Sequence, residues 1–405
     1  MELRCIQCGD TYALDDVLYA CRRCGDLLDV HYDLEELERR VVSTDWKARP
    51  LGVWKYGVFL PFPEDIEPLS LGEGGTGLHR CRRLEKELGI HGLYVKNEGE
   101  NPTGSFKDRG MTVGITKALQ LGFKTVICAS TGNTASSLAA YAARGGLKCI
   151  ILVPSGNIAL GKLAQAIMYG AEVLAVKGNF DDALGLVRRF VEEGKVYLLN
   201  SLNPFRIEGQ KTAAFEICEQ LGWKAPDRLI IPVGNAGNIT AYWKGFREFQ
   251  SLGIVQGLPK MVGVQSEGAA PIVKAYNLGL SALEPEPNPE TIATAIRIGN
   301  PVNWRRAIQA IRDSGGLGIS VEDEEILEAQ KLLASKEGIF VEPASAAPLA
   351  ALKKLLKADR IDPEERIVCV ATGHGLKDPE IALKRCKAPL EIDVDLDSLR
   401  KVVEA

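Results

Sequence analysis

Histidine is scarce in this sequence of 405 residues, which holds only four, and no HExxH or HxH pattern occurs among them. A hydrolase built on histidine is therefore poorly supported. No apolar run approaches the ~20 residues that cross a bilayer, and no apolar signal-peptide core follows Met1. There is no block of Lys or Arg, and the net charge is −4. These absences predict a cytoplasmic protein without a nucleic-acid or membrane partner.

Cysteine is unevenly distributed, and four of the ten cysteines form the pattern Cys5-x2-Cys8-x12-Cys21-x2-Cys24. Without a secretory signal, a disulfide framework is not expected. Four thiolates in two CxxC turns suit tetrahedral zinc, so residues 1–30 are predicted to form a zinc-ribbon-like unit around one zinc ion. Because all four ligand positions are filled, the metal is predicted to be structural rather than catalytic.

From residue 124 onward, short apolar runs alternate with segments of helical periodicity. The predicted strands are Lys124–Ala129, Cys149–Val153, Glu172–Val176, Arg228–Val233, Lys260–Val264 and Arg366–Ala371. The predicted helices are Thr134–Arg144, Leu160–Tyr169, Phe180–Glu193 and, after a capping box at Ser320 and Asp323, Glu324–Ser335. This alternation predicts an α/β fold with a parallel sheet covered by helices on both faces.

One glycine motif is misleading. Gly72-x-Gly74-x-x-Gly77 matches the dinucleotide-binding fingerprint, but a proline-rich stretch precedes it where an apolar strand is required. A nicotinamide cofactor is therefore not expected.

Four other segments place small and polar residues after predicted strands or at the start of predicted helices. They are Asn101–Gly110, Ser130–Thr134, Gly234–Asn238 and Thr372–Gly375. The carboxyl ends of parallel strands share one crevice, so we expect these segments to meet there.

Lys107 is the candidate nucleophile of the first segment. A turn delivers it to the start of a helix that continues through Met111–Leu121. The positive end of the helix dipole and burial both disfavour the ammonium form and lower the pKa of the amine. A neutral amine is what a Schiff base requires.

The remaining segments suit anions. Ser130–Thr134 offers hydroxyls and backbone N–H groups at a helix N-terminus, which fits a carboxylate, although a plain helix cap explains this segment equally well. Gly234–Asn238, ahead of a helix predicted to begin at Thr240, forms a phosphate cradle of successive backbone N–H groups. Thr372 presents a hydroxyl at the sheet edge.

These segments, together with Ala295–Pro301 and Glu342–Ala347, resemble the fold type II pyridoxal phosphate-dependent enzymes, the tryptophan synthase beta-like family. The similarity extends from about Pro68 to about Lys387. It implies two open, mostly parallel twisted sheets covered by helices, and a homodimer. The predicted units are the zinc-ribbon-like unit 1–30, a large cofactor-binding domain of 50–100 with 195–387, a small inserted α/β domain of 101–194, and a tail of 388–405.

The resemblance also implies roles for individual residues. Lys107 would hold pyridoxal 5'-phosphate as a Schiff base and carry protons, Asn133 would contact the phenolic oxygen, and Thr372 would face the pyridine nitrogen. The cofactor phosphate would be bound by Gly234, Asn235, Ala236, Gly237 and Asn238. The substrate carboxylate would be bound by Ser130, Thr131 and Thr134, and a substrate phosphate by Asn200, Ser201, Arg206 and Lys162.

The implied activity is that of a carbon–oxygen lyase acting on O-phospho-L-homoserine, which loses phosphate from Cγ and gains water at Cβ. Replacement of the phosphate of phosphoserine by sulfite uses the same core segments and stays an alternative. A serine or threonine dehydratase is disfavoured because it needs no second phosphate site. From a different class, residues 1–30 could be an interaction module, but they carry no basic surplus.

Overall fold

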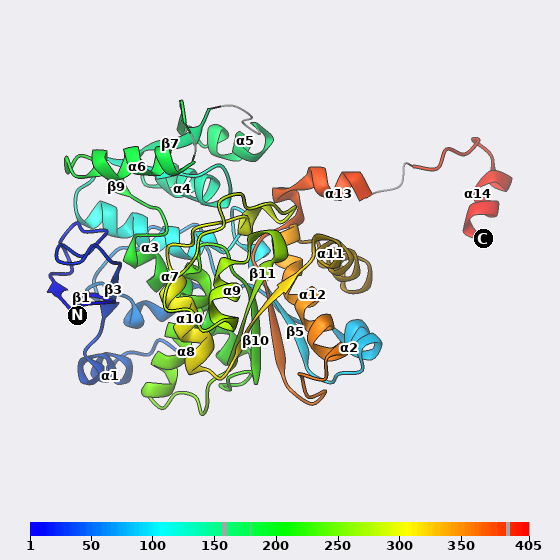
Figure 1. Ribbon diagram of the computed structural model, residues 1–405, viewed down its shortest axis with the longest axis horizontal. Helices are drawn as coiled ribbons and strands as arrows, with labels where there is room; N and C mark the ends of the chain where they lie inside the picture. Colours follow the sequence, from blue (N-terminus) through cyan, green and yellow to red (C-terminus); the bar gives the residue numbers. More distant parts are fainter. Residues whose placement is uncertain (156–159, 179, 386–388, 405) are drawn as a thin grey trace.

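The strands in the described part of the chain are divided among three sheets (Figure 1). The computed structural model describes residues 1–155, 160–178, 180–385 and 389–404. The two larger sheets are parallel except for one edge strand, and helices pack against them. The predicted α/β class with two mostly parallel sheets is confirmed.

The largest sheet has six strands. In spatial order they are β12 (Leu317–Val321), β11 (Lys260–Ser266), β10 (Arg228–Pro232), β13 (Ile367–Ala371), β5 (Leu93–Asn97) and the antiparallel β4 (Leu78–Arg80). Side chains of β10 alternate between two hydrophobic clusters, with Leu229 and Ile231 in one and Ile230 in the other. Burial on both faces explains why this strand is apolar throughout.

Helices cover both faces of this sheet. One cluster contains residues of α7 (Pro204–Gln220), α8 (Gly237–Ser251), α9 (Pro271–Asn277) and α10 (Trp304–Asp313). The other contains residues of α2 (Arg82–Leu88), α11 (Asp323–Glu337) and α12 (Pro343–Lys357).

The four-stranded sheet contains the first predicted strands. Its order is β8 (Glu172–Val176), β7 (Lys148–Pro154), β6 (Thr125–Ala129) and β9 (Tyr197–Leu198). One cluster joins it to α3 (Lys107–Gln120), α4 (Asn133–Arg144) and α5 (Leu160–Met168), and another to α6 (Phe180–Val191). The strands and helices predicted between residues 124 and 193 are confirmed to within two residues at either end.

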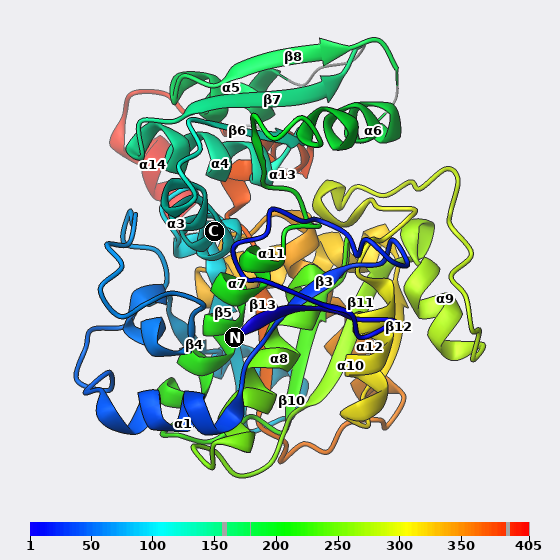
Figure 2. The ribbon, with the colours of Figure 1, turned by 90° about the vertical axis from the view of Figure 1, so that its left-hand side faces the viewer.

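The N-terminal segment forms a small antiparallel sheet followed by a helix. Its elements are β1 (Glu2–Cys5), β2 (Thr11–Tyr12), β3 (Leu28–His31) and α1 (Leu34–Ser43). Figure 2 shows this segment, in dark blue, in front of α7 and α8, and Lys244 of α8 forms an ion pair with Asp29 of β3. The N-terminal unit therefore packs on the helices of the largest sheet.

The chain ends in α13 (Pro379–Arg385) and α14 (Leu396–Val403). Figure 1 shows α14 apart from the rest of the molecule, and none of its residues is buried. Among the helices that the structure describes, none combines the length and the apolar character needed to cross a bilayer.

The predicted capping box at Ser320 is wrong. Ser320 belongs to β12, where parallel pairing with β11 keeps the backbone extended. Helix α11 begins after Glu322, whose backbone N–H donates to the Glu325 carboxylate at 2.8 Å. Asp323 instead accepts a hydrogen bond from Ser266 Oγ at 3.0 Å, which ties the helix start to β11.

Candidate active site

Lys107 is the first residue of α3 and follows a turn that contacts the end of β13. Gly104 adopts a φ of +82°, which permits this turn. The Phe106 N–H donates to the carbonyl of Thr372 at 3.0 Å. Because β13 belongs to the largest sheet and α3 packs on the four-stranded one, Lys107 lies at the junction of the two sheets.

The surroundings of Lys107 disfavour a charged amine. Burial, and then the nearby Arg206, lower the pKa of Lys107 to about 7, while Glu342 acts in the opposite direction. Nζ lies 3.8 Å from the centre of the Phe106 ring. A large share of this amine is therefore neutral near pH 7, and its nitrogen can attack a carbonyl carbon.

Asn133, the first residue of α4, is paired with a carboxylate that we did not predict as part of the site. Its Nδ2 donates to the two oxygens of Glu342 at 3.1 and 3.2 Å. Burial raises the pKa of Glu342, against the effects of Asn133 and Lys107. The one sequence signal for Glu342 is its place in the segment Glu342–Ala347, where it precedes α12 and resembles a helix cap.

Ser130, Thr131 and Thr134 surround the N-terminus of α4. Ser130 Oγ accepts a hydrogen bond from the Gly132 N–H at 3.2 Å, which shapes the turn. Thr131 is exposed and Thr134 is partly buried. The segment therefore presents hydroxyls at a helix N-terminus, an arrangement that suits a carboxylate.

The loop Gly234–Asn238 leads directly into α8, which begins at Gly237 and not at Thr240 as predicted. Ala236 adopts a φ of +65°, so successive N–H groups can face one side. Both polar atoms of the Asn238 side chain are buried and have no partner among the described residues. A buried amide without partners beside a helix N-terminus fits a phosphate group.

Arg206 lies in the first turn of α7 and supplies a second positive group. Its Nε is buried and makes no hydrogen bond within the described part of the chain. Burial lowers the pKa of Arg206 to about 10, so the guanidinium is still charged at neutral pH. An unpaired buried guanidinium is costly unless a ligand anion completes it.

The other predicted phosphate ligands differ in how many of their polar groups already form hydrogen bonds within the protein. The Asn200 amide exchanges two hydrogen bonds, each of 2.9 Å, with the backbone of Ala129 at the end of β6. That leaves one N–H for a ligand. The Ser201 carbonyl accepts from Asn303 Nδ2 at 3.3 Å. The side chain of Lys162, in α5, lies outside the described residues.

Thr372 is buried at the end of β13, and its hydroxyl lies 2.9 Å from Ser345 Oγ. Ser345 Oγ also accepts from the Gly373 N–H at 2.8 Å. Ser345 was not predicted as a site residue, and it fixes the orientation of the Thr372 hydroxyl.

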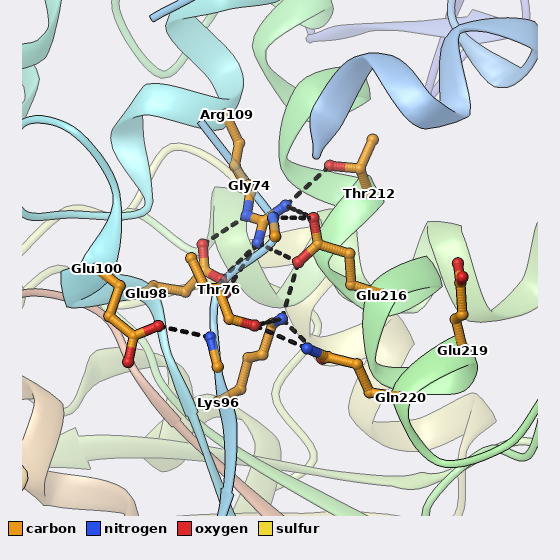
Figure 3. A network of polar contacts seen from close by, with 12 residues as sticks. Gly74, Thr76, Lys96, Glu98, Glu100, Arg109, Thr212, Glu216, Glu219 and Gln220 are labelled. Atoms are coloured by element: carbon orange, nitrogen blue, oxygen red, sulfur yellow. Dashed lines mark hydrogen bonds and ion pairs between the residues drawn. The ribbon is translucent and has the colours of Figure 1, made fainter. Parts of the chain in front are cut away.

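Helix α3 is anchored two residues beyond Lys107 by a buried network of charges (Figure 3). Arg109 donates to Glu98 at 2.6 Å and to Glu216 at 2.7 Å, and Lys96 Nζ lies 2.8 Å from Glu216. Burial alone would raise the pKa of Glu216, but Arg109 and Lys96 outweigh it and lower it to about 2. The network joins α3 to β5 and α7.

The four N-terminal cysteines converge as predicted. Their sulfur atoms all lie within 4.8 Å of one another. The sulfur atoms of Cys5 and Cys24 lie 3.4 Å apart, and those of Cys8 and Cys21 lie 3.5 Å apart. Zn–S bonds of about 2.3 Å place tetrahedral thiolates roughly 3.8 Å apart, so the cluster suits zinc.

The structure thus brings the predicted residues of α3, α4, α7, α8 and β13 to one place. It combines an amine with a depressed pKa, a charged guanidinium and several helix N-termini. Such a site can hold an aldehyde that carries a phosphate, together with an amino acid that carries a second one.

Comparison with known proteins points the same way. Residues 69–373 match a family described as pyridoxal-phosphate dependent enzyme. The chain is 60% identical over 404 residues to a threonine synthase of Methanocaldococcus jannaschii, with 100% of each chain covered. It is 56% identical over 402 residues to a threonine synthase of Methanosarcina acetivorans, covering 99% of this chain and 98% of the relative.

A solved structure with the same fold is the processed form of threonine deaminase isoform 2 from Solanum lycopersicum. The TM-score is 0.65, with 22% identity, 94% of this chain covered and 96% of the other.

Proposed function

Because the chain belongs to the pyridoxal-phosphate dependent enzymes and, within them, to the threonine synthases, we propose that it converts O-phospho-L-homoserine and water to L-threonine and phosphate. This reaction is the last step of threonine biosynthesis and makes the protein a carbon–oxygen lyase. The observation that carries the proposal is 60% identity, along the full length of both chains, to a curated threonine synthase. The second relative, which is 56% identical over 402 residues, is also a threonine synthase.

The residues at the junction of the sheets fit pyridoxal phosphate. Lys107 would hold it covalently, and the loop Gly234–Asn238 with its buried Asn238 amide would bind its phosphate. Asn133 would contact the phenolic oxygen and Thr372 the pyridine nitrogen. When bound, the cofactor would withdraw electron density from the substrate.

Lys107 would also move protons. With a pKa of about 7, its Nζ can accept a proton from Cα of the substrate, release it, and then accept one from Cβ, as loss of phosphate from Cγ requires. The ammonium group would then return a proton to Cγ, before water adds at Cβ. Glu342 would keep the Asn133 amide oriented, since the two side chains are hydrogen-bonded.

Binding of the substrate would divide between two groups of residues. Ser130, Thr131 and Thr134 would bind the carboxylate at the N-terminus of α4. Arg206 would bind the substrate phosphate because the buried Nε of its guanidinium lacks a partner among the described residues. Asn200, Ser201 and Lys162 would complete that site.

The four cysteines would hold one structural zinc ion, since two CxxC turns supply four thiolates. Metal analysis of protein purified under reducing conditions without chelator tests this: one zinc per chain is expected, and none contradicts it. We also propose a cytoplasmic homodimer that binds neither nucleic acid nor membrane, in keeping with a net charge of −4.

The function is tested by offering the purified enzyme two substrates. With O-phospho-L-homoserine, equal amounts of phosphate and L-threonine are expected. Turnover of O-phospho-L-serine with sulfite, and not of O-phospho-L-homoserine, would replace the proposal by the alternative reaction.

A further inference from the structure

Asn303 bonds to two loops of the site although it belongs to neither. Its backbone N–H donates to the Asn235 carbonyl at 3.1 Å, and its Nδ2 donates to the Ser201 carbonyl at 3.3 Å. An Asn at this position usually caps its own helix. Asn303 precedes α10, but its side chain does not cap that helix. Its side-chain amide is instead directed at the loop that contains Ser201, and its backbone N–H at the loop that contains Asn235.

The side-chain oxygen of Asn303 is held from the opposite direction. Arg306 Nη2 donates to Asn303 Oδ1 at 2.5 Å. Arg306 Nη1 lies 3.3 Å from the carboxylate of Asp29, in β3 of the N-terminal unit. Burial alone would raise the pKa of Asp29, but Lys244 and Arg306 outweigh it and hold it below its ordinary value. Asp29 therefore stays charged at neutral pH.

A second set of contacts starts from the same carboxylate. Lys244 of α8 lies 3.0 Å from Asp29 and 2.6 Å from Glu208, and it donates to the Val30 carbonyl at 2.6 Å. Glu208 follows Arg206 by two residues on α7. Asp29 is thus joined to both helices that begin at the anion-binding loops, α7 and α8.

We propose that Asp29, Arg306 and Asn303 are positioning residues that tie the N-terminal unit to the loops 200–203 and 234–238. Through them the N-terminal unit strengthens phosphate binding, although none of the three is placed among the ligands. The inference rests on the proposed function only in taking these loops as the phosphate sites. It extends the predicted structural role of residues 1–30 to the affinity of the active site.

The test uses the holoenzyme and its Arg306→Met variant. The readouts are the dissociation constant of pyridoxal phosphate and the KM and kcat for O-phospho-L-homoserine. We expect the dissociation constant and KM to rise by roughly 2- to 30-fold, the range found for residues that act through a network. The change in kcat should be smaller, and Arg306→Lys should restore part of the affinity.

Arg305→Met is the matched control. Arg305 lies on the same helix and pairs with Asp26 of the N-terminal unit at 3.5 Å, but its side chain is 45% exposed. Among the described residues it makes no hydrogen bond to either loop, so the variant should behave as wild type. The inference would be overturned if Arg306→Met had the same dissociation constant for pyridoxal phosphate and the same KM as Arg305→Met.

Asp29→Asn provides a second reading should Arg306→Met fail to fold. By itself Asp29→Asn should raise the dissociation constant of pyridoxal phosphate relative to Arg305→Met, and an unchanged constant would overturn the inference. Where both single variants fold, the double variant should weaken cofactor binding by less than the product of their separate effects, because both substitutions interrupt one connection. Independent effects would contradict the inference. The dissociation constant of pyridoxal phosphate is measured without substrate. An enzyme that binds the cofactor but does not make threonine would therefore refute the proposed function and leave this inference testable.

Discussion

Asn133 donates a hydrogen bond to Glu342 at 3.1 Å and thereby joins the start of α4 to the start of α12. The first helix packs on the four-stranded sheet and the second on the six-stranded one. Glu342 also raises the pKa of Lys107, against the larger effects of burial and Arg206. One carboxylate therefore connects the two sheets, the proposed phenolate ligand and the proposed nucleophile.

The first prediction concerns pH. With a Lys107 pKa of about 7, the amine is protonated below that value and cannot attack the cofactor aldehyde. Covalent capture of pyridoxal phosphate by apoenzyme should therefore accelerate as the pH rises, with a midpoint near 7. The measurement is the rate of the absorbance change on mixing. A midpoint near the ordinary lysine value of about 10.4 would contradict it.

The second prediction is that Glu342→Gln moves this midpoint to lower pH. The variant keeps an oxygen that accepts the Asn133 hydrogen bond, but it removes the negative charge that favours a protonated Lys107. Glu328→Gln, at an exposed position on α11, is the control and should not move the midpoint. An unchanged or raised midpoint in Glu342→Gln would show that the carboxylate does not act on Lys107.

The third prediction assigns substrate phosphate binding to Arg206. Arg206→Ala should reduce the stabilisation of the transition state with O-phospho-L-homoserine by about 2–5 kcal/mol. This loss lowers kcat/KM by a factor of roughly 30 or more. Arg206→Lys should lose less because it retains the charge, but not the planar pair of donors. If kcat/KM in Arg206→Ala equals that of wild type, Arg206 is not a phosphate ligand.

The fourth prediction concerns stability. Glu216→Gln leaves Arg109 and Lys96 with less buried negative charge and should cost about 3–5 kcal/mol in the free energy of unfolding. In the folded wild-type protein the pKa of Glu216 is about 2, below its ordinary value of 4.5. Its contribution is present above pH 4.5 and declines as the pH falls toward 2. Denaturant unfolding measures both the stability loss of Glu216→Gln and the pH dependence of wild-type stability. If Glu216→Gln is as stable as the control variant Glu328→Gln, the predicted stability loss is contradicted.

The parts of the site that could be predicted from the sequence are local. The lysine turn and the loop Gly234–Asn238 each carry their signal within a few consecutive residues, because a helix N-terminus or a glycine turn is a local structure. The start of α8 was nevertheless placed three residues late, at Thr240 and not at Gly237. A left-handed Ala236 gives no sign in the sequence.

The parts that could not be predicted depend on contacts between distant residues. Lys96 and Glu216 are 120 residues apart in the chain and meet only because β5 and α7 pack together. Asn303 resembles an ordinary helix cap, and its bonds to Asn235 and Ser201 follow from the position of α10 beside two loops. Buried polar pairs of this kind leave no periodic pattern.

The proposed enzyme depends on the attachment of the cofactor to Lys107. The most direct test of this attachment is borohydride reduction of the holoenzyme, followed by protease digestion and mass spectrometry. We predict that the reduced cofactor is attached to Lys107 and that Lys107→Ala loses both this adduct and turnover, with its fold intact. Attachment to another lysine, or near-normal turnover by Lys107→Ala, would contradict it.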